Sequence, residues 1–283
     1  MQEICSTLSA SNMSDPVVDA MASLGGKSNK SAVEAEFQKW MRVCYGIELE
    51  PYSIRVRVTS SLPGRLWQYM YIAVIPIYEI WSAIYNLGHA VFSKCALGSR
   101  GLVAVQEYWE NARRLEWGQH HPVLNALGDS FFALPLYYHT DGATIFHGGT
   151  YNVYSSSSPF ATGLSVDTKF PWAMVETGLF YDRWTEEDLQ SFCNWCGEVL
   201  ASGVWPSKGY EQEEFSKNSY RYRMGLNNER LMGPWVGAFA GWKGDLEAKV
   251  SHHGFFFCEY NIRRFTVCFL IKNNMILTPP IFE

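Results

Sequence analysis

Residues 134–200 constrain the fold more than any other part of the chain, because their pattern changes from the two-residue period of strands to the longer period of a helix. Three segments are rich in β-branched and aromatic residues: Leu134–Phe146, Tyr151–Ser155 and Phe170–Thr177. Glycine-rich and serine-rich stretches separate them, which is typical of strands joined by turns. The first two segments are expected to form a hairpin, and all three an antiparallel sheet.

A helix is expected directly after these strands. Thr185 is a suitable N-cap residue, and Glu186, Glu187 and Asp188 follow it. Negative charge in a first turn complements the helix dipole. The pattern runs to about Leu200, before Ser202-Gly203, so the sequence predicts strand, strand, strand, helix.

The chain before residue 128 has a mainly helical pattern. Ser31 to Glu34 form a capping box, and apolar residues follow at helical spacing as far as Cys44. Tyr52–Val58 alternates like a short strand. The aromatic segment Leu66–Phe92 is expected to form two helices, because Pro76 interrupts it, and Leu102–Glu116 a further helix.

The ends of the chain differ from its middle. Residues 1–31 are small and polar and are expected to be a disordered tail, followed by a helical domain over 32–127 and an α+β domain over 128–253. Within the latter, Ser207–Arg230 is expected to be looped and Trp242–Val250 to form a short helix. The predicted class is therefore α+β: a helical N-terminal half, then a three-stranded antiparallel sheet with one helix.

Composition excludes some classes of protein. Of the 283 residues, 47% are hydrophobic and 16% aromatic, enough for a packed core. The formal charge of −5 argues against coating nucleic acid through bulk charge, although a local basic patch remains compatible with it. Seven scattered cysteines favour free thiols in a reducing compartment. We therefore expect an intracellular protein of the cytosol or nucleus, with no membrane span.

Asp141 is the residue that most directly suggests chemistry. It follows an apolar run that begins at Leu134, and a carboxylate beside apolar neighbours is costly unless it is paired or binds a metal. Three antiparallel strands followed by a helix, with an aspartate in the first strand, is how a ribonuclease H-like nuclease or transposase core begins. Such enzymes hold two divalent ions with carboxylates from separate elements.

The expected ligands of Mg²⁺ or Mn²⁺ are Asp141, Asp167 and Asp245, which would also be the catalytic residues. Glu176 and Glu247 are further candidates. The simpler interpretation stays open, because Asp141-Gly142 is a common turn dipeptide and the acids after Thr185 are explained by a helix start.

A basic and aromatic stretch suggests a second kind of site. Its candidate nucleic-acid-binding residues are Lys217, Arg221, Tyr222 and Arg223. Alternating arginine and tyrosine side chains can grip phosphates and stack on bases. The alternative is an edge strand whose charges discourage pairing with other chains.

Two other patterns carry less information. Cys193 and Cys196 have metal or redox spacing, but they lie inside the predicted helix, which favours buried structural thiols. A zinc site would need further ligands, and His252, His253 and Cys258 are the nearest suppliers.

Several motifs resemble, in the same order, an uncharacterised family of proteins abundant in dinoflagellate genomes. They are Ile75–Ile80, Phe92–Lys94 with Leu97-Gly98, Tyr108-Trp109 to Leu115–Trp117, His121-Pro122, Leu136 to Asp141–Ala143, Asp167–Phe170 and Trp242–Glu247. The resemblance covers roughly residues 65–253. The multiplicity of these proteins is similar to that of mobile-element products, which implies a transposase-like origin. No catalytic residue can be transferred from this family.

The chain departs from that family after His253, where an apolar tail begins. We expect residues 254–283 to derive from a gene-model artefact, such as intron read-through or a shifted frame, which would leave an incomplete core. The leading functional hypothesis is a relic of a metal-dependent ribonuclease H-like nuclease or transposase that acts on DNA. The alternative is a non-catalytic interaction or scaffold protein that binds another protein through aromatic grooves.

Overall fold

The computed structural model describes residues 49–61, 64–127, 132–145, 149–164 and 168–244. Backbone contacts divide the chain into two compact units, 1–50 and 51–283, and every element below belongs to the second. The predicted helix over 31–44 and the expected tails 1–31 and 254–283 lie outside the described residues. The predicted domain boundary after residue 127 stays a prediction.

The unit begins with an antiparallel hairpin of β1 (Tyr52–Thr59) and β2 (Trp67–Val74). Ile54, Val56 and Val58 alternate with exposed or half-exposed residues and are buried, which is the expected pattern of a strand with one face on the core. The hairpin ends beside the large sheet, where the Ile75 amide donates to the Trp172 carbonyl at 2.8 Å.

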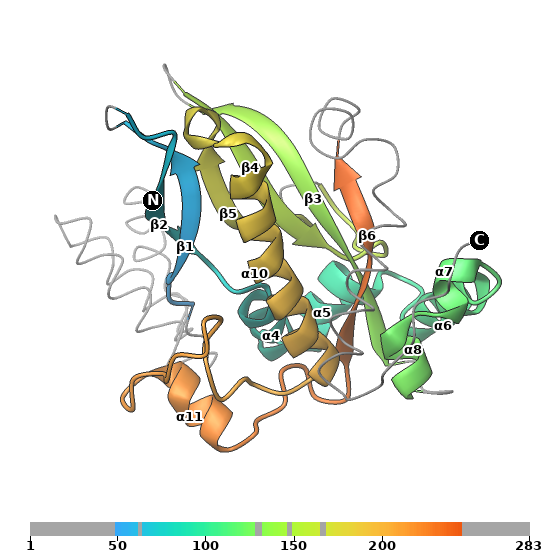
Figure 1. Ribbon diagram of the computed structural model, residues 1–283. Coiled ribbons are helices and arrows are strands. Elements are labelled where there is room, and N and C mark those ends of the chain that lie inside the picture. Colours follow the sequence, from blue (N-terminus) through green and yellow to red (C-terminus); the bar gives the residue numbers. More distant parts are fainter. Residues whose placement is uncertain (1–48, 62–63, 128–131, 146–148, 165–167, 245–283) are drawn as a thin grey trace, which may run out of the picture. The chain divides into compact units, whose positions relative to one another are not determined.

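Short helical segments connect this hairpin to the large sheet (Figure 1). They are α4 (Ile77–Asn86), α5 (His89–Phe92), the π-helical turn η1 (Ser93–Leu97), α6 (Leu102–Ala112), α7 (Glu116–Gln119) and α8 (Pro122–Leu127). Trp81 of α4 and Trp109 of α6 are fully buried in the core that these helices share with the strands.

The large sheet is four-stranded and mixed. Its strands are β3 (Ala133–Ile145), β4 (Gly149–Ser157), β5 (Phe170–Glu176) and β6 (Val236–Gly244), in the order β5-β4-β3-β6. The first three are antiparallel neighbours, whereas β6 lies parallel to β3. A short 3₁₀ turn, η2 (Thr177–Leu179), follows β5.

Proline in the central strand β3 is explained by its pairing. β3 pairs with β6 from Ala133 to Thr140 but with β4 only from Tyr137 onward. Pro135 therefore has a strand neighbour on the β6 side only. On the open side its missing N–H costs no ladder hydrogen bond.

The long helix α10 (Asp182–Ser202) covers one face of the large sheet (Figure 1). It packs closely on β6, since a Cβ added at Gly237 would lie 2.9 Å from the Leu200 Cβ. Leu136 contacts the same place, so even-numbered residues of β3 face α10. Odd-numbered residues face the other side, where the hydroxyl groups of Tyr137 and Tyr108 of α6 lie 3.2 Å apart. α11 (Tyr220–Leu226) follows in the segment that leads to β6.

The structure confirms the α+β class, the β3–β4 hairpin and the end of α10 at the left-handed Gly203. α10 begins earlier than predicted, at Asp182. Thr185 lies inside its first turns, and its hydroxyl accepts from the Tyr181 amide at 2.9 Å.

Four predictions about elements are wrong. Ser207–Arg230 is not simply a loop, because it contains the helix α11. Trp67–Val74 is a strand rather than a helix, and Pro76 separates that strand from α4 instead of separating two helices. The sheet is not three-stranded and antiparallel, because β6 adds a parallel strand. Trp242–Gly244 belongs to β6 rather than to a helix, and the rest of that predicted helix lies outside the described residues.

In the described part of the chain, no helix combines the length and the apolar character that a membrane crossing requires.

Candidate functional site

Asp141 lies in β3, close to where the parallel strand β6 ends. Its backbone partner in β4 is Val153, and the preceding residue, Thr140, pairs with Gly244, the last residue of β6. The Asp141 side chain is 44% exposed. The apolar run before it is buried, so Asp141 is the point where this strand leaves the core and reaches solvent.

Lys169 neutralises Asp141. It stands directly before β5, and its Nζ lies 2.9 Å from Oδ2 of Asp141. Both side chains are more than a third exposed. An exposed pair of this kind contributes about 0–1 kcal/mol, so it can open for another cation or anion at little cost.

His139 shares the Asp141 face of β3, two residues earlier in the strand. It is buried, and its Nε2 lies 2.7 Å from the Ser157 hydroxyl oxygen. Burial, together with the charges of Lys169 and Lys243, lowers the pKa of His139 to about 4, although Asp141 acts in the opposite direction. The imidazole is therefore neutral at pH 7 and takes part in a neutral hydrogen bond.

Lys243 brings a second cation to the same face. It pairs with His139 along the parallel strands, and its Nζ lies 4.0 Å from the ring centroid of Tyr137. We call Asp141, His139, Ser157, Lys169 and Lys243 the Asp141 face. It offers one carboxylate to a hard cation and two ammonium groups to an anion such as phosphate.

The other predicted metal ligands, Asp167 and Asp245, lie outside the described residues, as does Glu247. Glu176 is exposed at the end of β5, opposite Tyr151. Within the described ranges, no group of three or more His, Cys, Asp or Glu side chains could hold a metal. The donor type of Asp141 suits Mg²⁺ or Mn²⁺, but a complete ligand set is not brought together by the described residues alone.

The basic stretch folds differently from both sequence interpretations. Tyr220–Leu226 is the helix α11, capped by the Ser219 hydroxyl, so it is not an edge strand. Arg221 is buried and pairs with Glu79 of α4 through both of its carboxylate oxygens. Its guanidinium therefore joins two elements instead of facing solvent. A nucleic-acid-binding role stays a prediction for Lys217, Tyr222 and Arg223.

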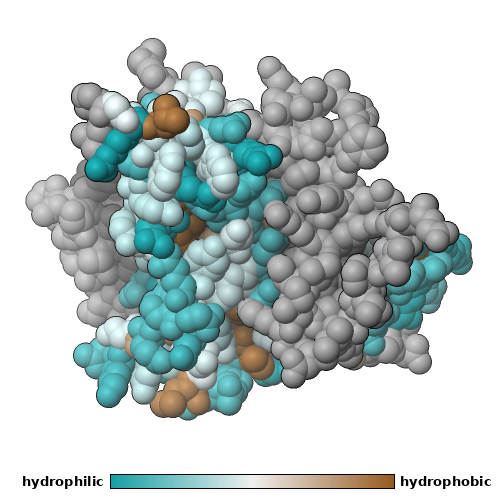
Figure 2. Space-filling view, viewed as in Figure 1, coloured by the Kyte–Doolittle hydropathy of each residue, from teal (hydrophilic) through white to brown (hydrophobic). Residues whose placement is uncertain are grey.

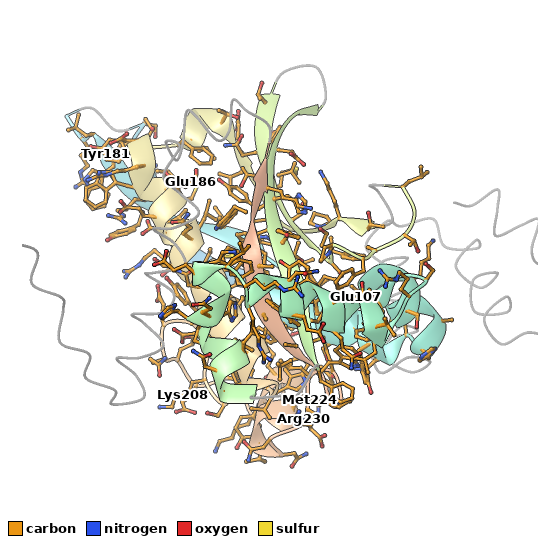
Figure 3. The ribbon with its side chains drawn as sticks, turned by 90° about the vertical axis from the view of Figure 1, so that its right-hand side faces the viewer. Glu107, Tyr181, Glu186, Lys208, Met224 and Arg230 are labelled. Carbon is orange, nitrogen blue, oxygen red and sulfur yellow. The ribbon has the colours of Figure 1, made fainter. Side chains whose placement is uncertain are left out.

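A buried polar cluster under α10 was missed by sequence reasoning. Glu186 is buried, and its Oε2 lies 3.5 Å from the hydroxyl of Tyr154 in β4. Figure 3 labels Glu186 in the upper part of α10. Burial raises the pKa of Tyr154, and Glu186 raises it further.

Three neighbouring side chains complete this cluster. They are Thr140 of β3, Asn152 of β4 and Gln190 of α10. Among the described residues, the buried Thr140 Oγ1 and Gln190 Nε2 atoms have no hydrogen-bond partner, whereas the Asn152 side chain hydrogen-bonds to Tyr154 and lowers its pKa. The sequence pattern indicates a helix-start acid at Glu186, and no local signal separates it from Glu187. Only the rotation of α10 against the sheet does so.

The Cys193 and Cys196 thiols are fully buried within α10 and form no disulfide. Burial raises the pKa of both thiols, which disfavours the thiolate form that a cysteine nucleophile requires at neutral pH. This agrees with the structural role expected for them. His252, His253 and Cys258 lie outside the described residues.

Comparison with known proteins gives no further support for an identity. No family model, no curated protein and no solved structure matches this chain. The resemblance to dinoflagellate proteins therefore stays a prediction, as does a nuclear or cytoplasmic location.

Proposed function

We propose that the chain is a relic of a metal-dependent, ribonuclease H-like nuclease or transposase that acts on DNA, with Asp141 as the first ligand of Mg²⁺ or Mn²⁺. Asp167 and Asp245 are the other proposed ligands. When bound, such ions activate a water molecule and stabilise the leaving oxygen of a phosphodiester.

The strand order supports this proposal. A ribonuclease H-like core has three antiparallel strands, then a helix, then a fourth strand that lies beside the first and parallel to it. In this chain β3, β4 and β5 are antiparallel, α10 follows, and β6 pairs in parallel with β3. Likeness of topology is analogy, because one fold can serve many functions.

The observation that carries the proposal is the position of Asp141 between two chain segments. Gly244, which directly precedes Asp245 in the sequence, pairs with the neighbour of Asp141 in β3. Lys169, two residues after Asp167, contacts Asp141 itself. Gly244 of β6 and Lys169, just before β5, therefore both lie beside Asp141 of β3. A metal site built from carboxylates of separate strands requires such an arrangement.

The residues of the Asp141 face have distinct proposed roles. Asp141 would hold the cation in place of its ion pair with Lys169. Lys169 and Lys243 would then face the phosphate groups of DNA. His139, neutral and buried beside Ser157, adds no positive charge that would repel the cation.

Calorimetric titration of Mn²⁺ into the full chain and into Asp141→Asn tests the proposal. We expect saturable binding by the native chain and none by the variant. Lys169→Met is expected to bind Mn²⁺ more tightly, because it removes the competing ammonium group. Equal binding by the native chain and Asp141→Asn would overturn the proposal, and so would the absence of saturable binding in all three proteins.

Asp167→Asn and Asp245→Asn test the other two proposed ligands separately, and each is expected to weaken Mn²⁺ binding. Glu176→Gln is the control, since Glu176 is an exposed acid of the same sheet. Nicking of supercoiled DNA in Mn²⁺ is expected for the native chain and not for Asp141→Asn.

One observation favours the second candidate, a non-catalytic interaction protein. Asp141 already has a partner in Lys169, and a surface ion pair needs no metal. Under this alternative, titration of Mn²⁺ gives no binding heat with the native chain or Asp141→Asn, and Lys169→Met gains no affinity for Mn²⁺.

A further inference from the structure

We propose that the outer face of the β1–β2 hairpin binds an extended single strand of nucleic acid. Its described residues are Arg55 of β1 and Trp67, Tyr69 and Tyr71 of β2, which we call the aromatic platform. This site is separate from the Asp141 face, and its ligand binding requires neither a metal nor catalysis.

The alternation of β2 produces the platform. Val74 is buried, and Met70 and Ile72 are partly buried and pack against the core. The rings between them point outward: Trp67 is 41% exposed, Tyr69 52% and Tyr71 69%. Alternate residues of a strand lie roughly 7 Å apart on one face. The rings of Trp67 and Tyr69 lie closer, with centroids 5.1 Å apart and planes nearly perpendicular, so β2 presents an edge-to-face pair and a third ring to solvent.

Arginine lies directly beside these rings. Arg55 pairs with Tyr71 across the hairpin, and its guanidinium carbon lies 4.6 Å from the Tyr69 ring centroid. Arg57 pairs with Tyr69 and lies 4.3 Å from the ring centroid of Trp184, at the start of α10. The register partners that share this face carry two arginines and no acid: Ser53, Arg55, Arg57, Thr59, Trp67, Tyr69, Tyr71 and Ala73.

Acids from other segments reach these arginines to different degrees. Asp188 binds Arg57 through two side-chain hydrogen bonds, at 2.5 and 2.9 Å, which fixes Arg57 to α10. Glu211 approaches Arg55 only to 3.7 Å, and both side chains are about half exposed. Such a weak pair yields to a phosphate group, so Arg55 is the cation available to a ligand.

The chemistry of the platform fits bases better than an apolar protein surface. The three rings are tryptophan and tyrosine, which stack on any base, with an arginine beside them for the backbone. The region of Figure 2 over β1, β2 and the start of α10 is mainly white and teal, so aliphatic side chains do not dominate it.

Fluorescence anisotropy with a labelled twelve-nucleotide oligothymidine, in EDTA, tests the proposal on the full chain. We expect saturable binding that Tyr69→Ala and Tyr71→Ala each weaken by roughly 5- to 150-fold, the range for loss of one stacked ring. Tyr71→Phe keeps the ring and is expected to bind like the native chain. Arg55→Gln is expected to weaken binding and to reduce its dependence on salt.

Val103→Ala is the matched control, because Val103 is an exposed apolar residue of α6, outside the platform. Thermal unfolding by circular dichroism shows whether each variant is folded. Three results would overturn the proposal: no saturable binding to the single strand, unchanged affinity in folded Tyr69→Ala and Tyr71→Ala, or equal affinity for a duplex of the same length. Glu176→Gln, outside both proposed sites, is expected to keep the affinity. Because the assay contains EDTA, it requires no metal at Asp141, so failure of either proposal leaves the other standing.

Discussion

The chain contains two carboxylate–cation pairs of similar contact distance in opposite surroundings. Glu79 and Arg221 join α4 to α11 in the core, and their side chains are 1% and 10% exposed. Asp141 and Lys169 join β3 to the start of β5 at the surface, and are 44% and 36% exposed. Both pairs are close contacts, at 2.5 and 2.9 Å between nearest atoms.

The difference shows that distance alone does not reveal the role of an ion pair. Once Glu79 and Arg221 are out of water, neither charge can lose the other without a large desolvation cost. Asp141 and Lys169 keep their contact with water, so each can exchange its partner. The buried pair is therefore structural, and the exposed pair is the one available for binding.

The largest expected effect is from Glu79→Gln. It leaves the Arg221 guanidinium buried opposite a neutral amide, and breaking a buried pair costs about 3–5 kcal/mol. Urea unfolding measures this loss. Lys208→Gln is the control, since it breaks an exposed pair with Glu214 at 3.2 Å and is expected to change stability by less than about 1 kcal/mol. Equal urea midpoints for the two variants would contradict the assignment of Glu79 to the core.

An intermediate effect is expected from acid, through His139. It lies beside the exposed pair but is itself buried, and its folded-state pKa is about 4, below the ordinary value of 6.5. The unfolded chain therefore binds a proton between these values while the folded chain does not. Stability is fully present above pH 6.5 and falls as the pH drops toward 4, by on the order of 3 kcal/mol.

Urea unfolding at a series of pH values between 7.5 and 4.5 measures this dependence. His139→Gln is expected to flatten it in part. Part of the pH dependence is expected to remain, because burial also lowers the pKa of His121. A profile for His139→Gln with the native slope would show that His139 is not protected from protons by burial.

The smallest expected effect is from the exposed pair. Asp141→Asn, Lys169→Met and the double variant form a cycle whose coupling energy is expected to be at most about 1 kcal/mol. The measurement is again urea unfolding. A coupling as large as the loss in Glu79→Gln would remove the contrast between the pairs and would make Asp141 a structural residue.

Local pattern was sufficient for some elements and insufficient for others. β3, β4 and α10 were predictable, because each has its own periodicity and a turn or cap at its ends. β2 alternates as clearly as they do, but its apolar run continues past Pro76 into α4, and the whole was interpreted as helical. Pairing with β1 decided that Trp67–Val74 is a strand.

β6 was less predictable still. Its sequence, Val236–Gly244, contains three glycines and little β-branched character, so propensity gives no strong strand signal. It is a strand because it pairs in parallel with β3, about a hundred residues earlier, and because Gly237 allows Leu200 of α10 to approach. No local pattern reports such a partner.

The site shows the same division. The change from an apolar run to Asp141 predicted a carboxylate at the end of a buried strand segment, and Asp141 is indeed half exposed there. The burial of Arg221 against Glu79, and of Glu186 but not Glu187 under α10, was not predictable, because charge and spacing are alike in the buried and exposed cases.

Local pattern was enough to predict the α+β class, the β3–β4 hairpin and the extent of most of α10, since these depend on interactions between residues close in the chain. Only the folded arrangement accounts for the parallel fourth strand, the outward rings on β2 and which charges are buried. Those features depend on contacts between distant segments and on the water that such contacts exclude. A local pattern of residues contains information about neither the distant contacts nor the excluded water.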